Sequence, residues 1–73
     1  GVTSVTVVSE DGTTADGLST SLFIMGVDEG AEYWRTHEGF DAVFITEDRN
    51  IYITEGLKDS FSSDLPYEVI KRK

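Results

Sequence analysis

The chain has 73 residues, no cysteine and a formal net charge of −8 at pH 7. This length allows one domain or a piece of one, and so short a chain buries only roughly 60 % of its unfolded surface. The absence of cysteine excludes disulfides and thiolate metal sites. Fourteen acidic residues against six basic ones repel phosphate backbones, so we expect no nucleic-acid partner. No apolar run is long enough to predict membrane insertion by this segment.

The first two predicted elements are a strand and a helix. Residues 3–9 are β-branched almost throughout, which is typical of a strand. Residues 14–25 are predicted to form a helix, with Thr13 as N-cap and Asp16 as the acid of a capping box. Gly26 is expected to end this helix, because glycine accepts the left-handed conformation found at helix ends.

A second helix is predicted to begin with Asp28 as its N-cap and to end at Gly39. Trp34, the only tryptophan, lies on its apolar side, where a core position is the expected role and a ligand platform the alternative. His37, the only histidine, has no cysteine or second histidine to form a metal site. We therefore expect it to lie on the surface, near the carbonyl end of the helix.

The second half of the chain is predicted to be mostly β-structure. Residues 40–47 and 50–55 form two β-rich runs separated by a short polar link, which indicates a hairpin. Residues 56–64 are expected to form a short helix or an ordered loop, and residues 67–71 a short closing strand.

The first strand of this hairpin has apolar residues on both faces. Phe44 and Ala42 point to one face, whereas Val43 and Ile45 point to the other, and a strand of this kind needs cover on both sides. We predict an α+β fold with a small mixed or antiparallel sheet and two main helices, in the order β-α-α-β-β-β. Because one helix layer covers one sheet face, covering structure is expected to be missing, which predicts an exposed apolar patch or self-association.

Asp16 and Thr20 are the candidate metal ligands. They are four residues apart, which places a carboxylate and a hydroxyl on one side of the predicted helix, away from Leu18 and Leu22. Two hard oxygen donors on a rigid face suit a hard cation such as Mg²⁺. The alternative is structural, because an acid near a helix start commonly serves the cap and the helix dipole.

The residues around this pair resemble a family signature. The run Ala-Asp-Gly-Leu-Ser-Thr-Ser-Leu-Phe-Ile-Met-Gly at residues 15–26 is similar to the C-terminal signature of the ApbE family of FAD:protein FMN transferases, Asp-Ala-Leu-(Ser/Ala)-Thr followed by an apolar run and Gly. The likeness continues through the predicted strands on both sides of this run. It departs at Gly17, where the family most often has Ala, a change that costs a helix about 1 kcal/mol.

The resemblance implies that residues 1–73 are the C-terminal fragment of an ApbE-type flavin transferase domain with a T-fold-like architecture. It implies Mg²⁺ as cofactor, with Asp16 and Thr20 as ligands, and FAD as substrate of the intact parent enzyme. The implied reaction attaches FMN to a Thr or Ser hydroxyl of a target flavoprotein and releases AMP. The implied partners are the remainder of the parent enzyme and this target, and the fragment alone is expected to be inactive.

Two rival interpretations stay open. Asp16 could act as general base for the attacking hydroxyl instead of binding the metal, although a metal-bound carboxylate is a poor base. The chain could also be a small acidic binding or scaffold module that has this fold without the chemistry. No residue is assigned to catalysis or to flavin binding within the segment. The family includes exported and membrane-anchored bacterial members, which leaves the location open between export and the cytoplasm.

Overall fold

The computed structural model describes residues 2–10, 12–37 and 39–72, without the side chains of residues 12–14. Four strands, one long helix and one short 3-10 helix make up this part of the chain. In chain order they are β1 (Val2–Ser9), α1 (Gly12–Thr36), β2 (Phe40–Thr46), β3 (Ile51–Thr54), η1 (Glu55–Leu57) and β4 (Tyr67–Ile70). The predicted α+β class is confirmed.

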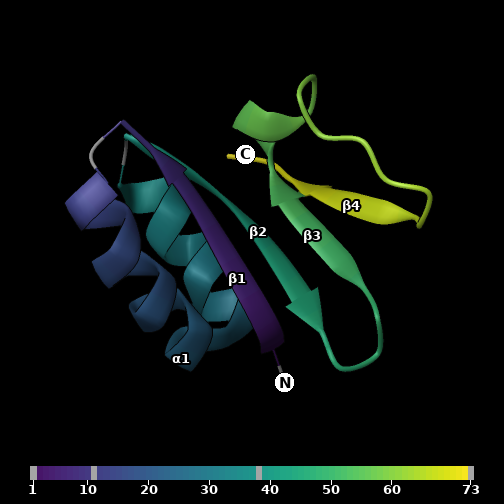
Figure 1. The fold of residues 1–73 in the computed structure, drawn as a ribbon, viewed down its shortest axis with the longest axis horizontal. Helices are drawn as coiled ribbons and strands as arrows, with labels where there is room; N and C mark the ends of the chain where they lie inside the picture. Colours follow the sequence, from purple (N-terminus) through teal and green to yellow (C-terminus); the bar gives the residue numbers. More distant parts are fainter. Residues whose placement is uncertain (1, 11, 38, 73) are drawn as a thin grey trace.

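The strands form one mixed sheet in the order β1-β2-β3-β4. β1 and β3 both pair antiparallel with β2, whereas β4 pairs parallel with β3. Figure 1 shows α1 beside β1 and β2, with β3 and β4 farther from the helix. The helix therefore covers one part of one sheet face.

The predicted hairpin is confirmed between β2 and β3. At its turn, the Thr46 amide donates to the Asn50 carbonyl and the Arg49 amide donates to the Thr46 carbonyl, both at 3.0 Å. Arg49 has a φ of 66°, a left-handed conformation in which a residue other than glycine is uncommon. This conformation closes a turn that lacks the glycine usual at hairpin tips.

The core lies between α1 and the sheet. Leu22 and Trp34 of the helix are almost completely buried, as are Ala42 and Phe44 of β2. Ala42 and Phe44 are two residues apart and so share a sheet face. The cluster contains Leu22, Ala31, Trp34, Phe40, Ala42, Phe44 and Ile70. The predicted core position of Trp34 is confirmed, and its indole Nε1 donates to the Phe40 carbonyl at 3.1 Å.

The structure joins the two predicted helices, with a kink between them, in one element. α1 is one helical element in which Gly26 alone has non-helical dihedral angles, φ 84° and ψ −178°. Figure 1 shows that the segments before and after this break run in opposite directions beside the sheet. Gly26 divides the segments as predicted. Asp28, however, is not an N-cap, because its own dihedral angles are already helical and Gly26 is the residue at the junction.

The helix ends also differ from the prediction. α1 begins at Gly12, so Thr13 lies inside the helix rather than before it, and the first turn contains no acid. The capping box of Thr13 and Asp16 is therefore wrong at the level of the backbone, while the Thr13 side chain lies outside the described residues. At the other end α1 stops at Thr36, three residues before the Gly39 predicted as its end.

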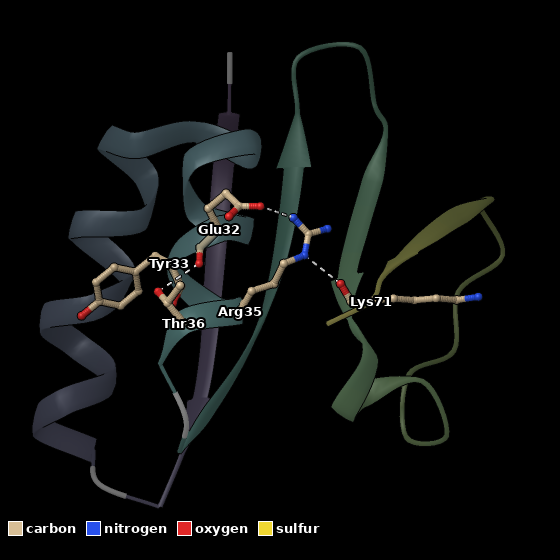
Figure 2. A network of polar contacts seen from close by, with 5 residues as sticks. All are labelled: Glu32, Tyr33, Arg35, Thr36 and Lys71. Atoms are coloured by element: carbon tan, nitrogen blue, oxygen red, sulfur yellow. Dashed lines mark hydrogen bonds and ion pairs between the residues drawn. The ribbon is translucent and has the colours of Figure 1, made fainter. Parts of the chain in front are cut away.

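The last turn of α1 is connected to the end of β4, as Figure 2 shows. Arg35 Nε donates to the Lys71 carbonyl at 2.8 Å, and Arg35 Nη1 contacts Glu32 Oε1 at 2.6 Å. His37 is exposed, with Nδ1 2.9 Å from the Tyr33 carbonyl and its ring stacked on that of Tyr33. This confirms the predicted surface position of His37 near the carbonyl end of the helix.

The sheet face away from α1 is unevenly covered. Ile51 and Ile53 of β3 are buried on this face. The Phe61 and Tyr67 rings pack edge to face, with 5.0 Å between their centroids. Val43 and Ile45 of β2 are only half-buried. The predicted apolar patch has a structural basis at these two residues, while self-association stays a prediction.

Candidate metal-binding face of helix α1

Asp16 and Thr20 both lie in the first segment of α1, and both are exposed. One helical turn separates them, so their side chains leave the same side of the helix. The opposite side is anchored to the sheet, since Leu22 is fully buried and Leu18 packs partly against the same core. The structure thus places the two candidate ligands on the solvent side of a fixed segment, and their role as ligands stays a prediction.

Three consecutive hydroxyl residues, Ser19, Thr20 and Ser21, lie in this part of α1, and the structure distinguishes them. Ser19 Oγ donates to the Asp16 carbonyl at 3.0 Å, and Ser21 Oγ donates to the Gly17 carbonyl at 3.2 Å. Both serine hydroxyls are therefore engaged with the backbone of their own helix. Among the contacts of the described residues, the Thr20 hydroxyl makes no hydrogen bond, which leaves its oxygen available to an external group.

A hollow of about 290 Å³ lies beside Thr20, between the helix and β1. It is lined by Val5, Ser19, Thr20, Phe23 and Ile24. Phe23 is 48 % exposed and Ile24 is 80 % exposed, so two large apolar side chains adjoin one another on this surface. Sequence reasoning missed this hollow, because the apolar run after Leu22 shows no periodicity that separates core residues from exposed ones.

The donors present fit part of a magnesium site. Carboxylate and hydroxyl oxygens are hard ligands, and Mg²⁺ takes six oxygens in near-octahedral order. Within residues 2–10, 12–37 and 39–72, no group of three or more His, Cys, Asp or Glu could hold a metal ion. Asp16 and Thr20 therefore supply two ligands at most, and the other oxygens have to come from elsewhere.

A second polar cluster, formed by Thr54, Asp41 and the Ala42 amide, was not predicted from the sequence and serves the fold. The Thr54 side chain is fully buried, and its hydroxyl accepts from the Ala42 amide at 3.0 Å and donates to Asp41 Oδ1 at 2.8 Å. These bonds continue the pairing of β2 with β3 beyond their last backbone pair, Val43 with Ile53. The cluster closes one end of the hairpin, and both hydrogen-bonding roles of the Thr54 hydroxyl are used within it.

A larger hollow, of about 580 Å³, lies away from the candidate ligands. It is lined by Val8, Ser9, Glu10, Gly39, Phe40, Asp41 and Arg72. Neither Asp16 nor Thr20 contributes to it, and Arg72 is already engaged with Trp34. Its size alone assigns it no role.

No helix in the described part of the chain is long and apolar enough to cross a membrane. This finding agrees with the absence of a long apolar run from the sequence.

Comparisons with known proteins agree with the signature at residues 15–26. The model of the ApbE family matches residues 1–44, more than half of the chain and the part that contains both candidate ligands. The chain is 40 % identical over 68 residues to an FAD:protein FMN transferase of Klebsiella pneumoniae (strain 342). It is 33 % identical over 58 residues to an FAD:protein FMN transferase of Treponema pallidum (strain Nichols).

These alignments cover most of this chain and little of the relatives. They include 92 % and 80 % of the chain, respectively. They include only 22 % of the Klebsiella protein and 16 % of the Treponema protein. The chain thus corresponds to a small part of each relative.

Proposed function

Because this chain belongs to the ApbE family, we propose that it is the C-terminal part of an FAD:protein FMN transferase. The intact enzyme would attach FMN from FAD to a Thr or Ser hydroxyl of a target flavoprotein, with Mg²⁺ as cofactor. The proposal is supported by the family match and by relatives that carry this name.

The proposed reaction is a phosphoryl transfer. The target hydroxyl oxygen forms a bond to the phosphorus on the FMN side of the FAD pyrophosphate, and the bond between that phosphorus and the bridging oxygen breaks. AMP leaves with the bridging oxygen, and the proton of the hydroxyl passes to solvent or to a base. No oxidation or reduction takes place.

The main observation that supports a metal-binding role for this chain is the arrangement of Asp16 and Thr20 on α1. They are exposed one turn apart on a helix whose other side is fixed to the core by Leu22. The Thr20 hydroxyl is unengaged among the described contacts, whereas its two serine neighbours bond to their own helix. We assign Asp16 and Thr20 as two ligands of Mg²⁺, which when bound supplies positive charge beside the phosphoryl oxygens.

The position of Asp16 on the helix is consistent with this role. The N-terminal end of a helix carries partial positive charge, which attracts phosphates but disfavours a bare cation. α1 begins at Gly12, so Asp16 lies just beyond its first turn and adds a negative charge near this end. The charge of Asp16 offsets the unfavourable effect of the helix end on the cation. The partial positive charge of the helix end remains favourable for the phosphates.

The test is FMN transfer by the intact protein carrying Asp16→Asn, measured over a range of Mg²⁺ concentrations. Asn keeps the size and one oxygen of Asp but removes the charge, so we expect transfer at limiting Mg²⁺ to fall by about 100-fold or more. The matched control is Asp28→Asn, which removes a charge from another exposed residue of α1 and should leave transfer unchanged.

The Mg²⁺ dependence separates the rival interpretations. A ligand role predicts that excess Mg²⁺ partly restores transfer by the Asp16→Asn enzyme, whereas a general-base role predicts no recovery. A folded Asp16→Asn enzyme that transfers FMN at the unmodified rate under limiting Mg²⁺ would show that Asp16 is not a ligand. An unmodified intact protein without any transfer would favour the binding or scaffold module.

A further inference from the structure

The outer edge of β1 is unprotected. β1 pairs only with β2 among the described strands, so the amides and carbonyls of Val2–Val8 on its other side pair with no described strand. Edge strands commonly carry charges or proline that prevent further pairing. Val2–Ser9 contains neither, although it is the longest strand of the sheet. β1 is therefore an open template for another strand.

The surface beside this edge carries no charge. Residues 17–27, which span most of the first segment of α1, contain no Asp, Glu, Lys or Arg. This is notable in a chain with fourteen acidic and six basic residues. Depletion of charge marks the centre of a protein interface, because burying an unpaired charge is costly.

Large apolar side chains are exposed at the same place. Ile24 is 80 % exposed and Phe23 is 48 % exposed, and both line the hollow that Val5 of β1 borders. Val5 of the edge strand β1 and the two apolar helix residues thus line one hollow. An extended segment lying there could pair with β1 and bury these side chains at once.

We propose that an extended, largely apolar segment from the upstream part of the same polypeptide pairs with the outer edge of β1 and covers Phe23 and Ile24. The inference rests on the proposal that this chain is the C-terminal part of a longer enzyme. The relatives have enough additional chain for such an occupant, because the matching region is only 22 % and 16 % of their lengths. Thr20 lines the same hollow, so the added segment encloses one side of the candidate metal site.

A second copy of the chain fits this surface less well. Each copy has a formal net charge of −8, and pairing two such molecules along one edge brings like charges together. The test therefore has to separate pairing within one polypeptide from pairing between copies.

The first measurement is residue-by-residue amide hydrogen exchange in the intact protein, without FAD or Mg²⁺. In an edge strand alternate amides point away from the sheet and exchange rapidly. Pairing on both sides predicts slow exchange at successive residues of Val2–Ser9. Retention of the alternating pattern would overturn the proposal, and neither result depends on transferase activity.

The second measurement compares two lysine variants of the intact protein by thermal unfolding. Ile24→Lys places a charge in the proposed contact, and we expect its midpoint to fall by about 5 °C or more. Leu65→Lys is the matched control, because Leu65 is also an exposed apolar residue, at 54 %, but is distant in sequence and does not line this hollow. It should shift the midpoint little.

Equal, small shifts for both variants would overturn the proposal. Sedimentation velocity on the same samples identifies the occupant. A monomeric protein destabilised by Ile24→Lys supports a segment of the same polypeptide. An unmodified dimer that Ile24→Lys converts to monomers would instead show that a second copy occupies the edge. If Ile24→Lys prevents folding of the intact protein, the exchange pattern of the unmodified protein decides alone.

Discussion

Three glycines of α1 have different surroundings, and their substitutions should have different effects. Gly26 has φ 84° and ψ −178°, a combination that side chains make costly. An added Cβ at Gly26 or at Gly17 would meet nothing within 4 Å. At Gly30 it would lie 2.8 Å from Cε2 and 2.9 Å from Cζ of the Phe44 ring. The backbone conformation therefore determines the cost of a side chain at Gly26, and the lack of space determines it at Gly30.

Gly26→Ala should lower the free energy of unfolding by about 1–3 kcal/mol, because Ala rarely adopts the required conformation. Urea unfolding monitored by circular dichroism measures the change. Gly17→Ala is the control on the same helix, in a regular helical conformation with open space around it. It should raise stability by up to about 1 kcal/mol. Equal effects of both substitutions would mean that the break at Gly26 does not need glycine.

Gly30→Ala should lower stability by about 1–3 kcal/mol despite the better helix propensity of Ala, because the Phe44 ring is fully buried and has little room to move. A double-mutant cycle checks this explanation. In a Phe44→Leu background the same substitution should cost less, since the ring atoms that an Ala Cβ would meet are gone. An unchanged cost in that background would place the strain elsewhere.

At the scale of elements, two arginines attach the end of β4 to α1. Arg35 Nε donates to the Lys71 carbonyl at 2.8 Å (Figure 2), and Arg72 Nη1 donates to the Trp34 carbonyl at 3.1 Å. The Arg72 guanidinium also lies 4.2 Å from the centre of the Trp34 ring. Lys71 and Arg72 are thus part of the fold, because their contacts hold the end of β4 against the helix.

Arg72→Ala should lower stability by about 1 kcal/mol, because it removes a hydrogen bond and a cation–π contact. It should also speed amide exchange in Tyr67–Ile70 and change the fluorescence of Trp34, the only tryptophan. Lys58→Ala removes an exposed cation after η1 and serves as the control. If both variants behave alike, charge rather than the contact with Trp34 explains the effect.

The sequence was sufficient for some elements and not for others. The β-branched run of β1 and the alternating Ile51 and Ile53 of β3 predicted strands, because strand formation leaves a local pattern. The parallel pairing of β4 with β3 joins residues that are distant in sequence, such as Ile51 and Tyr67, and leaves no local pattern. Asp28 was misassigned as an N-cap for a local reason, because the single residue Gly26 separates the two segments of α1.

The candidate site was predictable to a similar extent. The spacing of Asp16 and Thr20 identified two oxygen donors on one side of a helix, because helical geometry is local. The hollow beside Thr20 was not predictable, since it needs Val5 of β1 to lie next to Ile24 of α1. The different hydrogen bonding of Ser19, Thr20 and Ser21 also required the structure, because all three hydroxyls look equivalent in sequence.

At the scale of the whole molecule, the chain presents half-buried apolar residues, a strand edge and a proposed site with few ligands. Val43 and Ile45 are half-buried on the sheet face away from α1, and β1 lies at an edge of the sheet. The proposed metal site has the same character, because Asp16 and Thr20 would offer two of the six oxygens that Mg²⁺ requires. All three features are expected of a segment that works within a longer polypeptide.

The 73-residue chain by itself should therefore bind Mg²⁺ weakly, with a Kd on the order of millimolar or weaker, because Mg²⁺ gives up water reluctantly when few protein oxygens replace it. It should neither retain FAD nor transfer FMN. Titration with Mg²⁺, followed by amide chemical shifts, should perturb residues around Asp16 and Thr20, and Asp16→Asn should remove that response. Micromolar affinity in the isolated chain would contradict the prediction, since it would require a complete site that two exposed side chains one turn apart cannot provide.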